Sequence, residues 1–370
     1  MEGEHGPDER APAGGPTTRS TSPAALSALA PRIHQAWYIL AMSSEVGQAP
    51  IQRTLYGTPI TLFRTERGAV GALVDRCPHR NVPLSGGKVR GEDLQCPYHG
   101  WRFSTDGRCT TVPGLVGAAE HPGRKALAWT TREQQGFVWV WGDPTSEPIG
   151  EPFRFRYADD PGYLTVRREV RAAASVHAVV ENALDVPHTA FLHGGLFRTD
   201  GERRPIRCVV ERHTDRAVCE FIGESRPSGL AGRILSPSGG TVTHFDRFYL
   251  PSVTEVEYRI GEENHIVLNG ACTPADDWDT RLYAVVSLRT RLPRWLVGAV
   301  VKPLALYIFN QDAVVLKRQS DTLHRFGEAS YASTEIDLLG PHILRLMTRA
   351  ARGERGGEAD VYRREVTLMV

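Results

Sequence analysis

Two short loops, each carrying one cysteine and one histidine, limit what this chain can fold into more than any other feature of its sequence. The first reads CPH at residues 77–79 and the second reads CPYH at residues 96–99. Each loop lies between an apolar run and turn residues, so both can direct their side chains toward one point. Two thiolates and two imidazoles are a complete ligand set for a two-iron, two-sulfide cluster. Because imidazole is neutral, such a cluster is less negative than one held by four thiolates, and its reduction potential is higher.

Three simpler interpretations of these loops remain open. A structural zinc site is one, but zinc fingers usually pair cysteine with cysteine and histidine with histidine, whereas each loop here mixes the two. A disulfide between Cys77 and Cys96 is another, and it leaves both histidines without a role. Chance burial of the four residues is the third. The remaining cysteines have no histidine at matching spacing and are expected to be ordinary thiols; they are Cys109, Cys208, Cys219 and Cys272.

A second group of possible metal ligands lies in the sequence NALDVPHTAFLH at residues 182–193. Asp185 and His188 are three residues apart and would share one helical face, and His193 follows five residues later. Pro187 has no N–H group, so we expect the helix to be kinked or loosened there, which would let the two histidines converge. Two histidines and a carboxylate can hold Fe(II) with positions open for O2 and substrate. The simpler interpretation is that these histidines are polar groups near a helix end.

The distribution of apolar residues predicts an all-β region followed by a mixed one. From residue 51 to about residue 140, short runs rich in Val, Phe, Trp and Thr are separated by turn sequences such as SGGK and TDGR. Residues 142–152, GDPTSEPIGEP, are a candidate linker. A helical pattern at 176–186, several alternating runs, and a long helical stretch at 295–323 interrupted by Pro303 follow. This order predicts an α+β domain with an antiparallel sheet and helices on one face.

The two loops resemble those of Rieske iron–sulfur domains. CPHR and CPYHGW are similar to the C-x-H and C-x-x-H loops of that family, and the resemblance covers about residues 34–145. It implies that one iron of a [2Fe–2S] cluster is held by Cys77 and Cys96. The other iron would be held by His79 and His99.

The second motif extends the resemblance to the Rieske-type non-haem iron oxygenases. Asn182, Asp185, His188 and His193 match that family's D/N-x2-D-x2-H-x4-H pattern without a gap. The resemblance implies that the two histidines hold a mononuclear Fe(II) and that an aspartate on the long C-terminal helix is the third ligand. Asp312 is the best candidate because it lies in an otherwise apolar run, where an inward-facing carboxylate needs a cation or hydrogen bonds; the alternative is an exposed helix carboxylate. The weaker competitors are Asp276, Asp277, Asp279 and Asp321.

Asp185 has a separate role in the family that this chain resembles. There, the carboxylate at this position bridges a cluster histidine of one subunit to an iron-ligand histidine of its neighbour. We therefore expect Asp185 to link two subunits rather than to be a solvated helix residue, with Asn182 as a nearby amide that holds no metal. The resemblance also implies a head-to-tail homotrimer.

The resemblance and the sequence pattern together predict four segments. These are a disordered N-terminal tail at 1–32, a Rieske [2Fe–2S] domain at 33–145, a catalytic domain with a mononuclear non-haem iron at 146–352, and a polar C-terminal tail at 353–370. The expected fold class is α+β, with an all-β Rieske domain followed by a helix-grip, START-like catalytic domain that has a curved antiparallel sheet.

The function that the resemblance implies is that of an oxygenase component. It would use O2 to hydroxylate, demethylate or otherwise oxidise a small organic substrate, which we expect to be apolar and cyclic. The motifs look closer to the monooxygenase and demethylase branch than to dioxygenases with a small β-subunit. No G-x-G-x-x-G sequence follows a predicted strand, so electrons are expected from a separate ferredoxin or reductase. The alternative function is that of a Rieske electron-transfer subunit without oxygenase chemistry. The apolar run at 295–309 is expected to be either a core helix or a wall of the substrate site.

Charge and hydropathy exclude several other functions. The chain has 44 Lys and Arg against 43 Asp and Glu, a net charge of +1, which disfavours a nucleic-acid partner. It has no apolar run of about 18 residues, so no transmembrane segment is expected. The N-terminus lacks an apolar signal core, and six cysteines are too few for a disulfide scaffold. We therefore expect a protein of the reducing cytoplasm.

Overall fold

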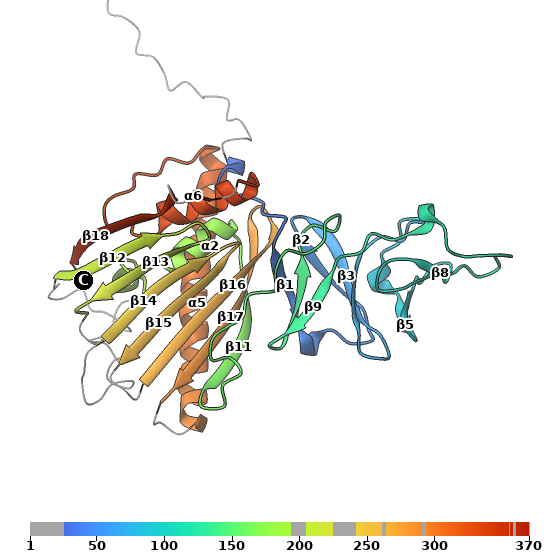
Figure 1. Cartoon of the computed structure of the whole chain (residues 1–370), viewed down its shortest axis with the longest axis horizontal. Helices are drawn as coiled ribbons and strands as arrows, with labels where there is room; N and C mark the ends of the chain where they lie inside the picture. Colours follow the sequence, from blue (N-terminus) through green and yellow to red (C-terminus); the bar gives the residue numbers. More distant parts are fainter. Residues whose placement is uncertain are drawn as a thin grey trace, which may run out of the picture.

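The computed structural model describes residues 26–193, 205–224, 242–260, 264–290, 294–354, 356–357 and 360–369, and between residues 294 and 302 it describes only one side chain, that of residue 299. Two domains lie side by side in Figure 1, one built of small sheets and the other of one large sheet with helices.

The N-terminal domain consists of short antiparallel strands, and over the described range there are ten of them. β1, β10 and β9 form one sheet, β2 to β4 form a second, and β5 to β8 form a third. This confirms the predicted all-β region. The strands are β1 (Trp37–Met42), β2 (Ile51–Leu55), β3 (Thr58–Arg64), β4 (Val70–Val74), β5 (Lys88–Arg90), β6 (Asp93–Gln95), β7 (Arg102–Phe103), β8 (Cys109–Thr111), β9 (Thr131–Gln134) and β10 (Phe137–Trp141), with 3-10 helices at Ser43–Glu45, Leu84–Gly86 and Pro122–Arg124.

The C-terminal domain is one eight-stranded antiparallel sheet in the order β11-β17-β16-β15-β14-β13-β12-β18. Helices pack on one face of this sheet (Figure 1). The architecture is therefore the expected α+β helix-grip arrangement. Its strands are β11 (Leu164–Ala172), β12 (Pro205–Arg212), β13 (Arg216–Ile222), β14 (Val242–Tyr249), β15 (Val253–Ile260), β16 (Asn264–Asp276), β17 (Asp279–Arg289) and β18 (Tyr362–Met369), and its helices are α2 (Val176–Ala183), α3 (Thr189–Leu192), α5 (Arg294–Phe326) and α6 (Gly340–Ala351).

Strand β10 joins the two domains. All five of its residues, FVWVW, are buried. In a strand with one face exposed to solvent, buried and exposed residues would alternate. Val138 and Val140 belong to the core of the N-terminal domain, whereas Trp139 and Trp141 belong to a second core that includes Tyr283 of the large sheet. A strand with a core on each face needs a continuous apolar run, and this explains the composition of β10.

Hydrogen bonds fix the same contact between the domains. The hydroxyl of Tyr283 donates to the backbone carbonyl of Leu40 at 2.7 Å. The hydroxyl of Thr273 donates to the backbone carbonyl of Ile39 at 2.6 Å. All four residues are buried, so these bonds form away from water. The large sheet thus has the N-terminal domain on one face and the helices on the other.

The structure differs from the sequence-based expectation at both predicted tails. Residues 353–370 were expected to be a polar tail, but Tyr362–Met369 form β18 and pair with β12 along its whole length. β18 is an edge strand in which five of the eight side chains are exposed and three are charged, which is why its sequence resembles a tail. At the other end, residues 1–25 lie outside the described residues, but Leu29 and Ala30 of the predicted tail 1–32 are buried.

Helix α5 is also more regular than the sequence predicted. The sequence predicted an interruption at Pro303, but this residue lies inside one continuous helix of 33 residues. Proline removes a single backbone N–H, and neighbouring hydrogen bonds keep the helix intact. Within the described segments, none of the helices has the length and apolar character needed to cross a membrane.

We predict that Tyr283→Phe weakens the contact between the domains. The substitution removes one donor and leaves the buried carbonyl of Leu40 without its partner, which costs about 1–2 kcal/mol of unfolding free energy. Thermal and denaturant unfolding measure the loss. The half-exposed Tyr331→Phe is the control and should change stability by less than about 0.5 kcal/mol; equal effects of both variants would contradict the prediction.

Candidate metal centres

The two cysteine–histidine loops meet at the end of the N-terminal domain that is farther from the large sheet (Figure 1). The first loop follows β4 and the second connects β6 to β7. Cys77 and Cys96 are buried and lie next to each other, and burial raises the pKa of the Cys77 thiol to about 11. The ring centroids of His79 and His99 are 4.5 Å apart. The structure therefore brings all four predicted side chains to one place, with the thiols inside and the imidazoles toward solvent.

Local backbone bonds and two aromatic rings hold these loops. Asn81 adopts a left-handed conformation, φ 61°, and its N–H donates to the carbonyl of Cys77. In the second loop, the N–H of Cys96 donates to the carbonyl of Trp101 at 2.8 Å. The Trp101 ring stacks on His79 with centroids 4.7 Å apart and an interplanar angle of 4°. The indole thus fixes the plane of an imidazole across the two loops.

A second centre lies where α3 faces α5. His188 precedes α3, His193 follows it, and Asp312 comes from the middle of α5. Oδ1 of Asp312 lies 3.6 Å from Nε2 of His188 and 3.1 Å from Nε2 of His193. One ligand atom from each of the three residues lies within 4.8 Å of the others, so the group could hold a metal ion. The structure brings together the three residues that the sequence nominated.

The segment before α3 shows how this convergence arises. The sequence predicted a kinked helix around Pro187, but α2 ends at Ala183 and a turn separates it from α3. His188 and His193 therefore occupy the two ends of a four-residue helix rather than one long face. Asp185, in the turn, remains close to His188, with Oδ2 3.5 Å from Nδ1.

Asp312 supplies a direct test of whether a cation fits this site. Its Oδ1 is buried and makes no hydrogen bond, although two imidazole nitrogens surround it. A buried carboxylate oxygen without a donor is costly, and a metal ion at this point would satisfy it. Burial disfavours ionisation of Asp312, but the imidazoles hold the pKa of its carboxyl below the usual range. The donor set fits a divalent metal.

The remaining ring nitrogens of both histidines have oxygen neighbours. Burial alone would lower the pKa of His188, but Asp185 and Asp312 raise it to about 9. Nδ1 of His193 is hydrogen-bonded to Oε1 of Gln311 at 2.9 Å. A carboxylate or amide on the far nitrogen fixes the orientation of a metal-binding imidazole. Gln311 was not among the residues predicted from the sequence; its position next to Asp312 was the available signal.

The weaker aspartate candidates are engaged elsewhere. Asp321 pairs with Lys317, Asp277 with Arg32 and Asp279 with Arg171. Asp276 accepts a hydrogen bond from a backbone N–H. None of these four belongs to the group of possible ligands around Asp312.

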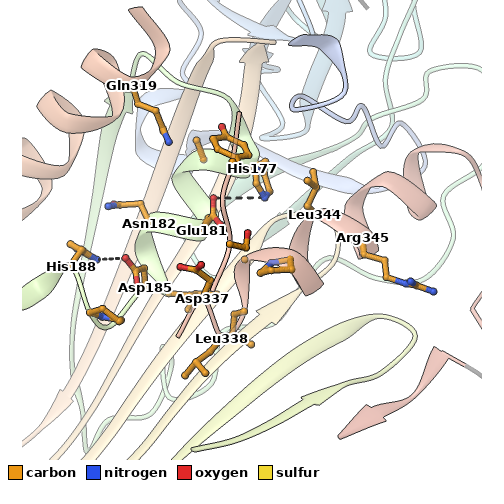
Figure 2. A pocket seen from close by; sticks show the side chains of 18 of the residues that line it. His177, Glu181, Asn182, Asp185, His188, Gln319, Asp337, Leu338, Leu344 and Arg345 are labelled. Atoms are coloured by element: carbon orange, nitrogen blue, oxygen red, sulfur yellow. Dashed lines mark ion pairs between the residues drawn. The ribbon is translucent and has the colours of Figure 1, made fainter. Parts of the chain in front are cut away.

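A large cavity adjoins the second centre. Its volume is about 1340 Å³, and its walls come from α2, α5, α6, β13 and the segment 330–339. Asp185, His188 and Asn182 line it, and Figure 2 shows them beside Glu181 and His177 of α2. The sequence analysis gave Glu181 and His177 no role.

Comparisons with known proteins give a match for each of the two domains. Residues 36–122 match the model of the Rieske [2Fe-2S] domain, and residues 172–353 match that of the vanillate O-demethylase oxygenase C-terminal domain. The oxygenase component of dicamba O-demethylase from Stenotrophomonas maltophilia is 31% identical over 67% of this chain and 63% of that protein. The oxygenase component of chloroacetanilide N-alkylformylase from Rhizorhabdus wittichii is 32% identical over 58% of this chain and 62% of that protein. Both matches thus span less than two thirds of the relative's length.

The fold has close counterparts among solved structures. The crystal structure of dicamba monooxygenase bound to dicamba superposes with a TM-score of 0.72 at 23% identity, covering 87% of this chain and 98% of that one. This likeness establishes a shared two-domain fold.

We predict that Cys96→Ser removes the cluster. A serine hydroxyl does not replace a thiolate as a ligand to iron, so the purified variant should lose its acid-labile sulfide and its red-brown colour. Cys109→Ser is the matched control, because Cys109 is also buried in this domain but lies outside the two loops. Stoichiometric zinc without labile sulfide in wild-type protein prepared anaerobically would favour the zinc alternative.

We also predict that Asp312→Asn lowers the affinity for mononuclear iron by more than about tenfold, because the amide lacks the charge that the metal requires. Acid-labile sulfide should stay at the wild-type level, since the cluster loops lie in the other domain. Iron analysis, corrected for cluster iron, measures the loss. Asp321→Asn on the same helix should keep all its iron; full iron retention in both variants would remove Asp312 from the site.

Proposed function

Since this chain joins a Rieske [2Fe–2S] domain to a vanillate O-demethylase-type domain and so belongs to the Rieske-type non-haem iron oxygenases, we propose that it is the oxygenase component of a multicomponent system. Its cofactors are a [2Fe–2S] cluster and a mononuclear Fe(II). We assign the cluster to Cys77, Cys96, His79 and His99. We assign the iron to His188, His193 and Asp312.

The observation that carries this proposal is the buried oxygen of Asp312 between two imidazole nitrogens. The alternative, a Rieske electron-transfer subunit without oxygenase chemistry, has no use for such a site. Bound Fe(II) would supply the activation of O2. The chain itself orients the two imidazoles through Asp185 and Gln311, and the side chains of His188, His193 and Asp312 are mostly buried.

The position of the cluster loops supports a further part of the proposal, a head-to-tail homotrimer. Strands β5 to β8 lie at the opposite end of the molecule from the helices that hold His188 and Asp312 (Figure 1). Electrons from a cluster at that end would therefore reach the iron of a neighbouring subunit more directly. His99 is exposed at the tip and Asp185 is 39% exposed, so both are accessible for a contact between subunits. A repeated contact of this kind closes into a ring when its rotation permits.

The partners follow from the chemistry. Electrons would come from a separate ferredoxin or reductase, and the substrates would be O2 and a small, apolar cyclic compound that is hydroxylated or demethylated. The small apolar cavity between α5 and the sheet, lined in part by Val166, Ala284 and Phe309, has a volume of about 20 Å³ and is too small for such a substrate. Side chains of the predicted wall at 294–298 and 300–302 lie outside those described. We place the protein in the reducing cytoplasm, where Cys77 and Cys96 would stay available as thiolate ligands.

Substrate turnover tests the proposed activity. Iron-loaded protein, supplied with a surrogate reductase and isotopically labelled O2, should add labelled oxygen to members of a panel of phenolic and polycyclic compounds or release a labelled dealkylation product. Product mass measures the result. Rapid cluster reduction and reoxidation without any substrate-dependent O2 consumption would favour the electron-transfer alternative.

We predict that Asp185→Asn keeps both metal centres but slows electron transfer between them by about 10–100-fold. The amide has the same shape but one acceptor oxygen fewer and no charge, so it orients the two imidazoles less well. Single-turnover reoxidation of the pre-reduced cluster, with substrate and O2 present, measures the rate. Asp321→Asn is the control. Wild-type kinetics in Asp185→Asn, or a wild-type protein that is fully active as a monomer, would contradict the bridging role.

A further inference from the structure

Two titratable residues of α2 lie in the large cavity and have no role in the chemistry proposed above. His177 and Glu181 are one helical turn apart and project from the same side of α2 (Figure 2). The side chain of His177 is 3% exposed, and that of Glu181 is 38% exposed to the cavity. Nε2 of His177 lies 4.0 Å from Oε2 of Glu181 and has no hydrogen-bond partner.

His177 is a neutral acceptor that lacks a donor. Burial lowers the pKa of its imidazole to about 4, although a hydrogen bond with the backbone of Gly340 opposes this shift. The ring therefore carries no charge near pH 7. With Nδ1 directed at the backbone, Nε2 is a buried lone pair that an O–H group could satisfy.

Glu181 can provide that O–H group when it binds a proton. Burial raises the pKa of its carboxyl, and Asp185 and Asp337 raise it further, to about 7. Tyr331, from the same segment as Asp337, also faces it. A Cβ on Gly340 would overlap the Glu181 carboxylate, so the glycine leaves room for this group at the start of α6.

The two charges that raise the pKa of Glu181, those of Asp185 and Asp337, are both negative. Of the four arginines that line the cavity, Arg345 and Arg349 pair with Asp360, at 3.6 and 2.8 Å, and Arg352 pairs with Glu354 at 3.7 Å. Figure 2 shows Arg345 directed away from the carboxylates of Glu181, Asp185 and Asp337. Additional negative charge near Asp185 would therefore be opposed unless one of these carboxylates became neutral.

We propose that Glu181 is the proton-binding partner of the Asp185–His188 contact, taking up a proton from the cavity when negative charge arrives there and donating the new O–H to Nε2 of His177. The inference rests on the proposed function and deepens it, because the arriving charge is the electron that a reduced Rieske cluster would deliver to O2 at the site beside His188. The cluster would lose one electron and O2 would gain it. One proton passes from water to the Glu181 carboxylate, and no bond between heavy atoms is made or broken. Glu181 is a positioning residue, since it acts through Asp185.

The sign of the pH dependence follows from linkage. Below about pH 7, Glu181 is already protonated, and its neutral carboxyl does not oppose the incoming electron. Above that pH it is ionised, and electron arrival must be accompanied by proton uptake. The rate of cluster reoxidation in wild-type protein should therefore fall as the pH rises from about 6 to about 8.

The first test is the pH profile of single-turnover cluster reoxidation in the full-length oxygenase with substrate and O2. Wild type should slow by about fivefold between pH 6 and pH 8. Glu181→Gln, which is neutral at every pH, should keep the fast rate throughout. Asp337→Asn is the matched control: it removes a neighbouring negative charge but retains Glu181, so the same fall should occur at lower pH. A Glu181→Gln profile that falls as steeply as that of wild type would overturn the proposal.

The second test does not depend on turnover. Infrared difference spectra of the full-length protein, with its cluster kept oxidised, should show one carboxyl that titrates near neutral pH in wild type and is missing in Glu181→Gln. A wild-type protein without such a carboxyl would overturn the proposal. A different outcome would refute the proposed function instead. In that case the carboxyl titrates as expected, but the reduced cluster of the iron-loaded protein does not reoxidise at any pH, so electron transfer does not occur.

Discussion

A buried carboxylate oxygen without a hydrogen-bond donor is the constraint on which the C-terminal domain depends. Oδ1 of Asp312 faces two imidazole nitrogens, and only a cation compensates such an arrangement well. One histidine lies at each end of the short α3, and α5 places Asp312 next to both of them. The turn between α2 and α3 then brings Asp185 to the outer nitrogen of His188. The proposed metal ligands and the groups that orient them thus come from one short stretch of chain and one helix.

The rigidity of the contact between the domains is the physical reason for the head-to-tail assembly that we propose. β10 has a core on each face, and hydroxyls of the large sheet donate to carbonyls of β1. Such a contact does not hinge easily, because every movement would break buried bonds. The cluster loops are therefore held at the far end of the molecule (Figure 1). A second subunit is the simplest means of placing a cluster beside the iron.

The sequence predicted those parts of the structure that are determined by residues close together in the chain. The motif at 182–193 predicted that His188 and His193 lie close together, and alternating apolar residues predicted most strands. Residues whose neighbours are distant in sequence were harder to assign. Five of the eight side chains of β18 are exposed and three are charged, so only its pairing with β12, more than 140 residues earlier, makes it a strand. Likewise Glu181 owes its unusual environment to Asp337 and Gly340, which no local pattern connects to it.

The pairing of β18 with β12 also has a consequence for biosynthesis. A ribosome completes β12 to β17 and both long helices before it reaches Tyr362–Met369. Until then, one edge of the large sheet presents unpaired backbone groups from Pro205 to Arg212. Sheet edges of this kind pair readily with other chains, so nascent molecules carry a temporary risk of aggregation that ends when the last strand docks. The charged side chains of β18 then become the permanent cover of that edge.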